Sequence, residues 1–213
     1  VNFTMINCRM DDINDRSRWG VIGTNFCKNI VIEDCVLSRM DSHQGVSGEY
    51  TLRRTMLGTA GFNAIGRGVL TVEDSTIYGS SLVGLRGDYG STWEGRGVIR
   101  NSRWIPGNGA RLWPRLIGGG NDGTHDFGYP CYMPSEIIID GLFVDDSKHP
   151  DDYEGFYFFN HPKPPREGLP EERPSPTTGS EDHHPELRTA SGKQPSLPDG
   201  YTGTEVEFLP DTK

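Results

Sequence analysis

The chain has 213 residues, of which 33% are hydrophobic and 28 are glycine, and it carries a formal net charge of −9. No stretch approaches the roughly 18 consecutive apolar residues that a membrane-spanning helix requires. No basic stripe is present to neutralise the phosphates of a nucleic acid, so we expect neither a membrane nor a nucleic acid as partner.

A short segment recurs six times along the chain. The copies read FTMINCRM, IVIEDCVL, YTLRRTML, LTVEDSTI, GVIRNSRW and EIIIDGLF, aligned on the marker residues Asn7, Asp34, Arg54, Asp74, Asn101 and Asp140. The positions two before and three after the marker are apolar in every copy, ending with Ile138 and Phe143, and the position just after it is always small. Such a repeat predicts a solenoid in which each turn buries its apolar face against the next.

The position just before the marker alternates in charge over four successive copies: Glu33, Arg53, Glu73 and Arg100. Stacked parallel strands lie about 4.8 Å apart, so opposite charges on adjacent strands attract while like charges repel. The alternation therefore predicts that the copies lie above one another with this column facing solvent.

A second segment follows the marker in four copies: WGVIG, QGVSG, NAIGR and VGLRG. We align Val21, Val46, Ile65 and Leu85 as an inward column with small neighbours. Period-2 alternation and many glycines exclude helical repeats and predict short strands joined by turns.

NIVIEDCVLSRMDSHQGVSG (29–48) and VLTVEDSTIYGSSLVGLRG (69–87) resemble the repeat unit of the pectate-lyase-like superfamily. The resemblance covers residues 1–160 and implies an all-β, right-handed parallel β-helix of about six coils. It also implies a secreted, cell-surface or periplasmic protein whose polysaccharide substrate or glycan lies in a groove over the sheet of the G-apolar strands.

The rest of the chain departs from this coil. We expect a long loop at 105–135 and an aromatic core strand within 147–160. Ten of the 15 prolines follow His161, so 161–213 is predicted as an irregular tail that packs on the helix or acts as a linker, with GTEVEFLP (203–210) as one last strand. Because the chain opens inside a patterned strand, we interpret it as a piece of a longer protein.

Charged side chains near the G-apolar sheet suggest polysaccharide lyase chemistry, which needs a base and cations that neutralise a uronate carboxylate. We predict His43 as the base and Arg67 and Arg86 as the cations, with Asp88 as a fourth catalytic candidate at the edge of the groove. Further substrate-binding candidates are Asp41, Phe62, Glu94, Trp113 and His125.

Two alternative functions stay open at this point. Asp41, Glu49, Asp88 and Glu94 supply carboxylates for a glycoside hydrolase. The solenoid is alternatively a non-catalytic glycan-binding protein, adhesin or spike, in which Arg86 and Asp88 only pair on the surface. No metal site is predicted; calcium at Asp151 and Asp152 is the one cation that the sequence suggests.

Overall fold

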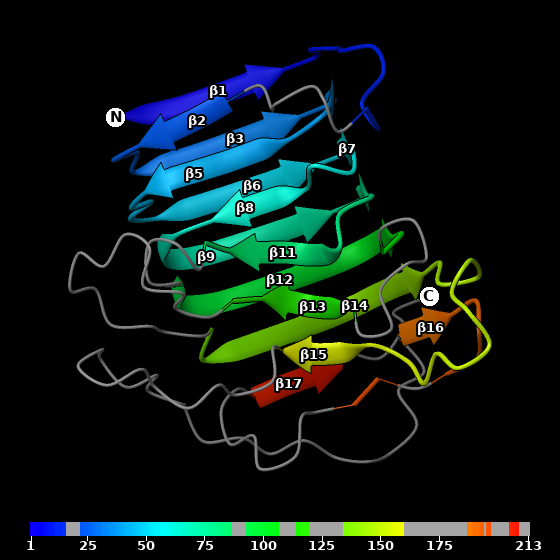
Figure 1. The fold of residues 1–213 in the computed structure, drawn as a ribbon. Helices are drawn as coiled ribbons and strands as arrows, with labels where there is room; N and C mark the ends of the chain where they lie inside the picture. The colour runs from blue at the N-terminus through cyan, green and yellow to red at the C-terminus, as the bar shows by residue number, and fades with distance from the viewer. Residues whose placement is uncertain are drawn as a thin grey trace, which may run out of the picture.

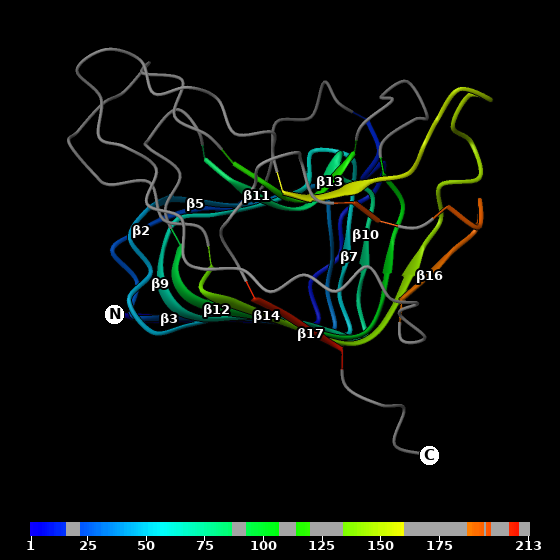
Figure 2. The same ribbon diagram turned by 90° about the horizontal axis from the view of Figure 1, so that it is seen from below.

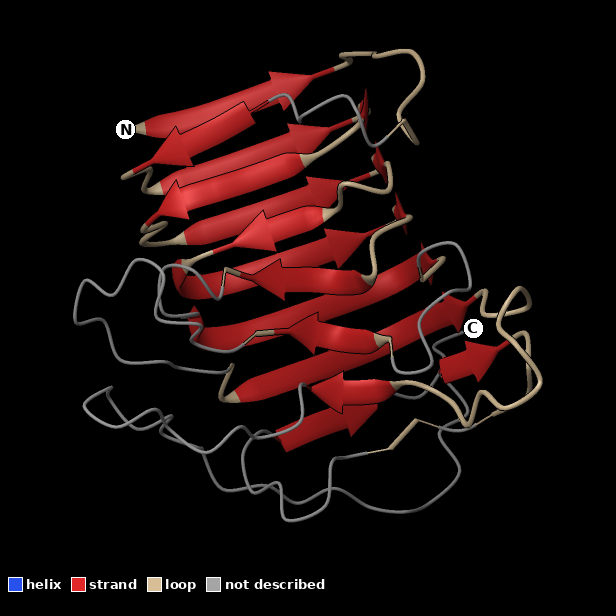
Figure 3. Cartoon of the chain, viewed as in Figure 1, coloured by secondary structure: helices blue, strands red, loops and turns tan. Residues whose placement is uncertain are grey.

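The computed structural model describes residues 1–15, 22–86, 93–106, 114–119, 134–159, 187–193, 195–196 and 205–208. These residues form strands, turns and loops and no helix (Figure 1, Figure 3), which confirms the predicted all-β parallel β-helix. None of the described segments forms a helix long and apolar enough to cross a membrane.

The described strands form two parallel sheets. The first sheet runs in the order β1-β3-β6-β9-β12-β10-β7-β4, and β14 joins it beside β12, followed by β16 and β17. Its strands are β1 (Asn2–Ile6), β3 (Asn29–Glu33), β4 (Val36–Leu37), β6 (Glu49–Arg53), β7 (Met56–Leu57), β9 (Gly66–Glu73), β10 (Thr76–Ile77), β12 (Trp93–Trp104), β14 (Glu136–Val144), β16 (Leu187–Thr189) and β17 (Glu205–Phe208). The second sheet runs in the order β15-β13-β11-β8-β5-β2. Its strands are β2 (Ile22–Asn25), β5 (Met40–Gln44), β8 (Phe62–Ala64), β11 (Ser81–Leu85), β13 (Arg115–Gly118) and β15 (Tyr157–Phe159).

Each coil runs along the first sheet, bends sharply, and returns through the second sheet. Figure 2 looks along the axis and shows this right-handed path, with β3, β12 and β14 on one side and β5 and β11 on the other. The apolar side chains of both sheets face each other across the interior, where Ile32, Leu52 and Val72 have no exposed surface. These three residues pair in successive coils, as the repeat predicts.

The marker residues of the repeat make the bend in the first sheet. Asn7, Asp34, Arg54, Asp74 and Asn101 all have left-handed backbone, with φ between 41° and 56°. Asparagine and aspartate tolerate this conformation better than most residues, which accounts for their preference at the marker. In the sixth copy the left-handed residue is Gly141, with φ of 86°, and not Asp140.

The predicted alignment of the sixth copy is therefore wrong by one residue. Ile139 and Val144, rather than Ile138 and Phe143, continue the buried columns, because Ile139 pairs with Ile99 and Val144 with Trp104. Since a one-residue slip exchanges the two faces of a strand, Phe143 is exposed.

The corrected alignment adds Asp140 to the column of alternating charges. Arg53 donates to Glu73 at 2.8 Å, and Asp140 stands beside Arg100 in the next coil at 3.4 Å. The solvent-facing charge column predicted from the sequence is confirmed and extends over five coils, from Glu33 to Asp140. Exposed ion pairs of this kind contribute little stability each but penalise slipped registers.

A buried ladder of polar side chains stands just behind the bend. The backbone N–H of Cys35 donates to Oγ1 of Thr55 at 3.3 Å, that of Thr55 to Oγ of Ser75 at 3.1 Å, and that of Ser75 to Oγ of Ser102 at 3.2 Å. The Thr55 hydroxyl itself donates to the carbonyl oxygen of Arg53 at 3.0 Å. Each small side chain thus satisfies a buried N–H of the coil before it, which explains why this column is small and polar.

In the second sheet Val46, Ile65 and Leu85 are buried as predicted, but their predicted alignment in one column is wrong. Leu85 pairs with Ala64, and Val46 forms a bridge with Gly66, so Val46, Ile65 and Leu85 do not share one position. Val21 lies outside the described residues.

Two further segments test the predictions for the second half of the chain. The loop predicted at 105–135 is interrupted by β13, which pairs with β11 and β15. The aromatic core strand is confirmed, because Phe156, Phe158 and Phe159 are all buried.

Two strands of the predicted tail join the stack. β16 pairs with the end of β14 and β17 pairs with its beginning, so the two short strands together continue the sheet beyond β14. The strand expected in GTEVEFLP is confirmed as β17; the boundary predicted at 160 stays a prediction, because residues 160–186 lie outside the described residues.

Candidate functional site

The outer face of the second sheet presents a row of small and polar residues. The register aligns Asp41 of β5 with Asn63 of β8, then with Gly84 of β11 and Gly118 of β13. The strand positions before them, Met40 and Phe62, are buried in the core. Because successive side chains of a strand point to opposite faces, the row lies on the outside.

Three members of this row, Asn63, Gly84 and Gly118, line a depression of about 230 Å³. Its walls are the turns Thr59–Gly61 and Gly79–Ser81 and the side chain of Arg115. The lining is mainly hydroxyl, amide, guanidinium and backbone groups, which suits a ligand rich in hydroxyl groups. A depression of this size and openness accommodates a few sugar units of a longer chain rather than enclosing a small molecule.

Polar side chains lie close over two glycines of this depression. A Cβ atom added at Gly84 would stand 2.6 Å from Oδ1 of Asn63, and one added at Gly118 would stand 2.4 Å from Oγ of Ser81. Both distances are far below van der Waals contact. The Asn63 amide and the Ser81 hydroxyl therefore lie across the glycines, where they are placed to hydrogen-bond a ligand.

A group of three ionised side chains borders the row. Oδ2 of Asp41 accepts from Arg39 at 2.7 Å and from Arg86 at 2.8 Å. The three side chains are only 14%, 6% and 16% exposed for Arg39, Asp41 and Arg86 respectively. Arg86 follows β11 and reaches across β8 to β5, so this ion-paired group ties three neighbouring coils together.

The side chains of this group are less exposed than those of the surface ion pairs of the first sheet. A paired carboxylate with so little exposure is costly to break, because removing one partner leaves a desolvated charge. Behind it, burial raises the pKa of Tyr50 well above its ordinary value, and the negative charge of Asp41 acts in the same direction. Tyr50 thus remains neutral in the core.

The predicted catalytic residues lie on different sheets. His43 belongs to β5 of the second sheet and Arg86 follows β11 of the same sheet, whereas Arg67 is an exposed residue of β9 in the first sheet. Arg67 pairs in register with Glu94 of β12, which is also exposed. The structure therefore brings His43 and Arg86 onto one sheet and places Arg67 and Glu94 side by side on the other.

Phe62, predicted as a substrate-binding residue, faces the interior of the structure. Its side chain is 1% exposed and packs edge to face against Tyr50, with the ring centroids 4.8 Å apart. Phe62 pairs in register with Met40, which faces the interior. It cannot stack on a sugar in this structure.

Three other candidates, Asp88, Trp113 and His125, lie outside the described residues. Within the described ranges no group of three or more His, Cys, Asp or Glu side chains is arranged to hold a metal ion. Calcium at Asp151 and Asp152 therefore stays a prediction that rests on two carboxylates alone.

The residues of the site that sequence reasoning missed are Arg39, Asn63, Ser81 and Arg115. Arg39 stands two residues before Asp41 and so on the same face of a strand, a signal that was available. Arg115 was predicted to lie in a loop, and only its pairing with Ser81 and Tyr157 shows that it belongs to the sheet.

The fold and the groove define a parallel β-helix with a polar outer face on one sheet. Over 94 residues the chain is 34% identical to a capsule KL64-specific depolymerase of Klebsiella phage P510. The match covers 39% of this chain and 9% of that relative, so the chain spans about a tenth of the relative's length. No family model and no solved structure matches the chain.

Proposed function

We propose that the chain is part of a depolymerase that acts outside cells and binds a capsular polysaccharide in the groove over the second sheet. The observation that carries this proposal is the 34% identity over 94 residues to a capsule-specific depolymerase. The groove supports it, because its lining is mainly polar. A solenoid with such a face offers an extended surface along which a polymer chain can lie.

We further propose that cleavage proceeds by β-elimination on an acidic sugar. In this reaction a base removes the proton from the carbon next to the uronate carboxylate, the electrons form a carbon–carbon double bond, and the glycosidic oxygen leaves with a proton. Cations beside the carboxylate stabilise the negative charge that develops. His43 is the proposed base, and Arg115 and Arg86 are the proposed cations, since all three lie in or directly after strands of the second sheet.

Hydrolysis on the same scaffold is the second candidate. It needs two carboxyl groups on opposite sides of the scissile bond. Of the predicted carboxylates that the structure describes, Glu49 and Glu94 belong to the first sheet, and Asp41 is held by two guanidinium groups. This separation favours elimination over hydrolysis.

The test is incubation of the 213-residue chain with purified acidic capsular polysaccharide, beginning with that of capsule type KL64. The expected result is the ultraviolet absorbance of an unsaturated uronate together with a fall in polymer length. New reducing ends without that absorbance would assign a hydrolase. Binding without cleavage would assign a glycan-binding protein, and absence of binding to any acidic capsule would refute the proposal.

A pair of matched variants locates the site. Arg115→Ala is expected to lower the rate of cleavage about 100-fold, as loss of a group that stabilises developing charge does. Arg188→Ala is the control, because Arg188 is an exposed arginine of β16 in the other sheet. Equal rates for the two variants would remove Arg115 from the groove chemistry.

A further inference from the structure

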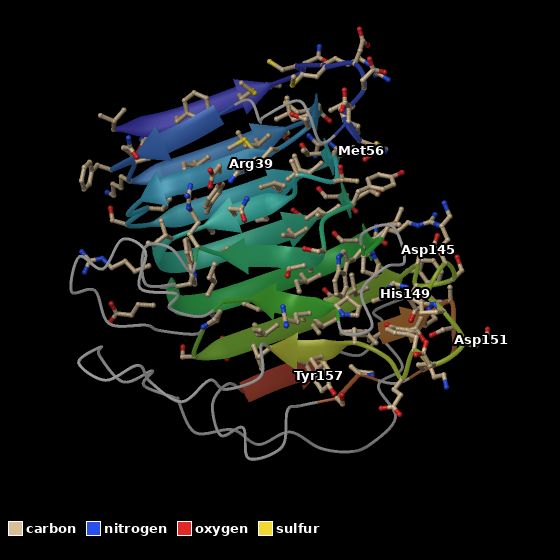
Figure 4. All side chains as sticks on the ribbon, viewed as in Figure 1. Arg39, Met56, Asp145, His149, Asp151 and Tyr157 are labelled. Atoms are coloured by element: carbon tan, nitrogen blue, oxygen red, sulfur yellow. The ribbon has the colours of Figure 1, made fainter. Side chains whose placement is uncertain are left out.

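A second depression lies on the far side of the turns that border the groove. Its volume is about 360 Å³. Its floor is the outward column of the strands after the bend, where Met56, Thr76 and Arg103 pair in successive coils. The loop after β14 forms the facing wall, and Figure 4 shows Asp145 and His149 on this edge of the molecule, below Met56.

The loop that forms the wall is held in a fixed conformation. The buried Asp146 carboxylate accepts from the backbone N–H of Ser191 at 2.8 Å and from its hydroxyl at 2.6 Å. Nδ1 of His149 lies 3.1 Å from the carbonyl oxygen of Asp146, and its ring stacks on Tyr153 at 4.2 Å between centroids. The depression thus exists before a ligand arrives, which lowers the entropic cost of binding.

The charge of this cavity is opposite to that of the chain. Arg103 and Asp145 form an ion pair that cancels their charges, and Asp145 also accepts from the Ser147 hydroxyl at 2.7 Å. These two donors lower the pKa of Asp145, Ser147 having the larger effect, so it stays ionised and paired. Lys148 also lines the cavity, is exposed, and forms no ion pair with any described residue. It leaves a net positive charge in a chain whose formal charge is −9.

The remaining lining has one apolar side and one polar side. Met56, Ile105 and Pro106 supply apolar surface, while Thr76 and Tyr78 carry hydroxyl groups. A pyranose ring has the same division, with C–H groups on its faces and hydroxyl groups around its edge. A sugar that also carries a carboxylate would match the lysine.

We propose that this cavity, lined by Tyr78, Arg103 and Lys148, is a second carbohydrate site that binds a carboxylate-bearing sugar unit. The proposal rests on the proposed function for the kind of ligand and adds a site outside the groove. The two depressions flank the same turns, since Thr59–Gly61 follow Met56 closely and Gly79–Ser81 follow Tyr78 directly. One polysaccharide crossing these turns would contact both depressions. The protein would then bind an acidic polymer on both sides of the turns.

The experiment is a titration of the isotope-labelled 213-residue chain with sodium D-glucuronate and, separately, with D-glucose. We follow the amide resonances of Tyr78, Lys148 and His149 by NMR. Glucuronate is expected to shift all three with a dissociation constant of about 1 mM, the range for so small a ligand. Glucose is expected to bind about tenfold more weakly, and added salt should weaken only the glucuronate response.

Lys148→Met and Lys193→Met are the matched variants, because both lysines are exposed and only the first lines the cavity. Lys148→Met should weaken glucuronate binding about tenfold and leave glucose binding unchanged, while Lys193→Met should change neither. Equal shifts with the two sugars, or equal effects of the two variants, would overturn the proposal.

Failure of the proposed function is separable from failure of this site. Glucuronate binding that depends on Lys148 in a chain that cleaves no capsule would leave the site standing and refute the depolymerase. Cleavage that depends on Arg115 without glucuronate binding at Lys148 would do the reverse.

Discussion

The buried polar ladder predicts the cost of removing a single hydroxyl group. Thr55 is 2% exposed, and its Oγ1 is the acceptor for the backbone N–H of Cys35 at 3.3 Å. Thr55→Val keeps the shape of the side chain and deletes the hydroxyl. The Cys35 N–H then stays buried without an acceptor, whereas the carbonyl of Arg53 keeps the backbone N–H of Asp34 as a donor at 3.1 Å.

The expected destabilisation follows from the loss of the acceptor for the Cys35 N–H. A buried N–H left without a partner costs about 1–3 kcal/mol, whereas the extra methyl group contributes little. For a chain of this size a loss of 1 kcal/mol lowers the melting temperature by about 2–4 °C. We therefore expect Thr55→Val to melt about 2–12 °C below the unmodified chain.

The assay is thermal and urea unfolding followed by circular dichroism, with the m value as a check that both proteins unfold over the same surface. Thr71→Val is the matched control, because Thr71 lies on the outer face of β9 beside the buried Val72. It should change the free energy of unfolding by less than about 0.5 kcal/mol. Equal stabilities for the two variants would refute the assignment of the ladder as a stabilising feature.

Three other predictions concern the loop after β14, the pH dependence of stability and the groove. Asp146→Ala should release residues 187–193, because it removes both bonds to Ser191, and amide hydrogen exchange there should quicken while β6 stays protected. The partners of Asp145 lower the pKa of its carboxylate in the folded chain. This carboxylate therefore adds stability above its unfolded pKa near about 4, and that stability is lost as the pH falls through the lower folded pKa. Asp145→Asn should flatten the fall in melting temperature below about pH 4. Gly84→Ala should push Asn63 aside and slow polysaccharide cleavage about tenfold with little loss of stability, whereas Gly45→Ala, whose Cβ would meet nothing within 4 Å, should leave the rate unchanged. An unchanged acid transition in the Asn variant, or equal rates for the two alanine variants, would contradict the last two expectations.

The first sheet could be predicted from the sequence because its periodicity is strict. Each copy places an apolar residue two positions before a left-handed residue and another three positions after it, so the columns can be found by counting. The sixth copy failed for a definite reason: Gly141 takes the left-handed position, and the aspartate before it imitates the marker. A glycine in that column is the better guide, since glycine adopts positive φ without a steric cost.

The second sheet could not be predicted in the same way because the turns that lead into it differ in length. Residues 38–39 separate β4 from β5, residues 58–61 separate β7 from β8, and residues 78–80 separate β10 from β11. Each change of one residue exchanges the inner and outer faces of the strand that follows. Phe62 pairs with Met40 and shares its buried position, a register that counting from the marker residues does not give.

This difference between the sheets bears on where a binding site can change. The bend, the hydroxyl ladder and the charge column all belong to the first sheet and constrain its register coil by coil. A residue gained or lost in the turns at 58–61 or 78–80 would leave those contacts in place, because they form before the chain enters the turn. It would nonetheless change which side chains β8 and β11 present to a ligand. The contacts that fix the register of the first sheet thus lie apart from the groove, and the sheet that is hard to predict by counting is the one where the groove lies.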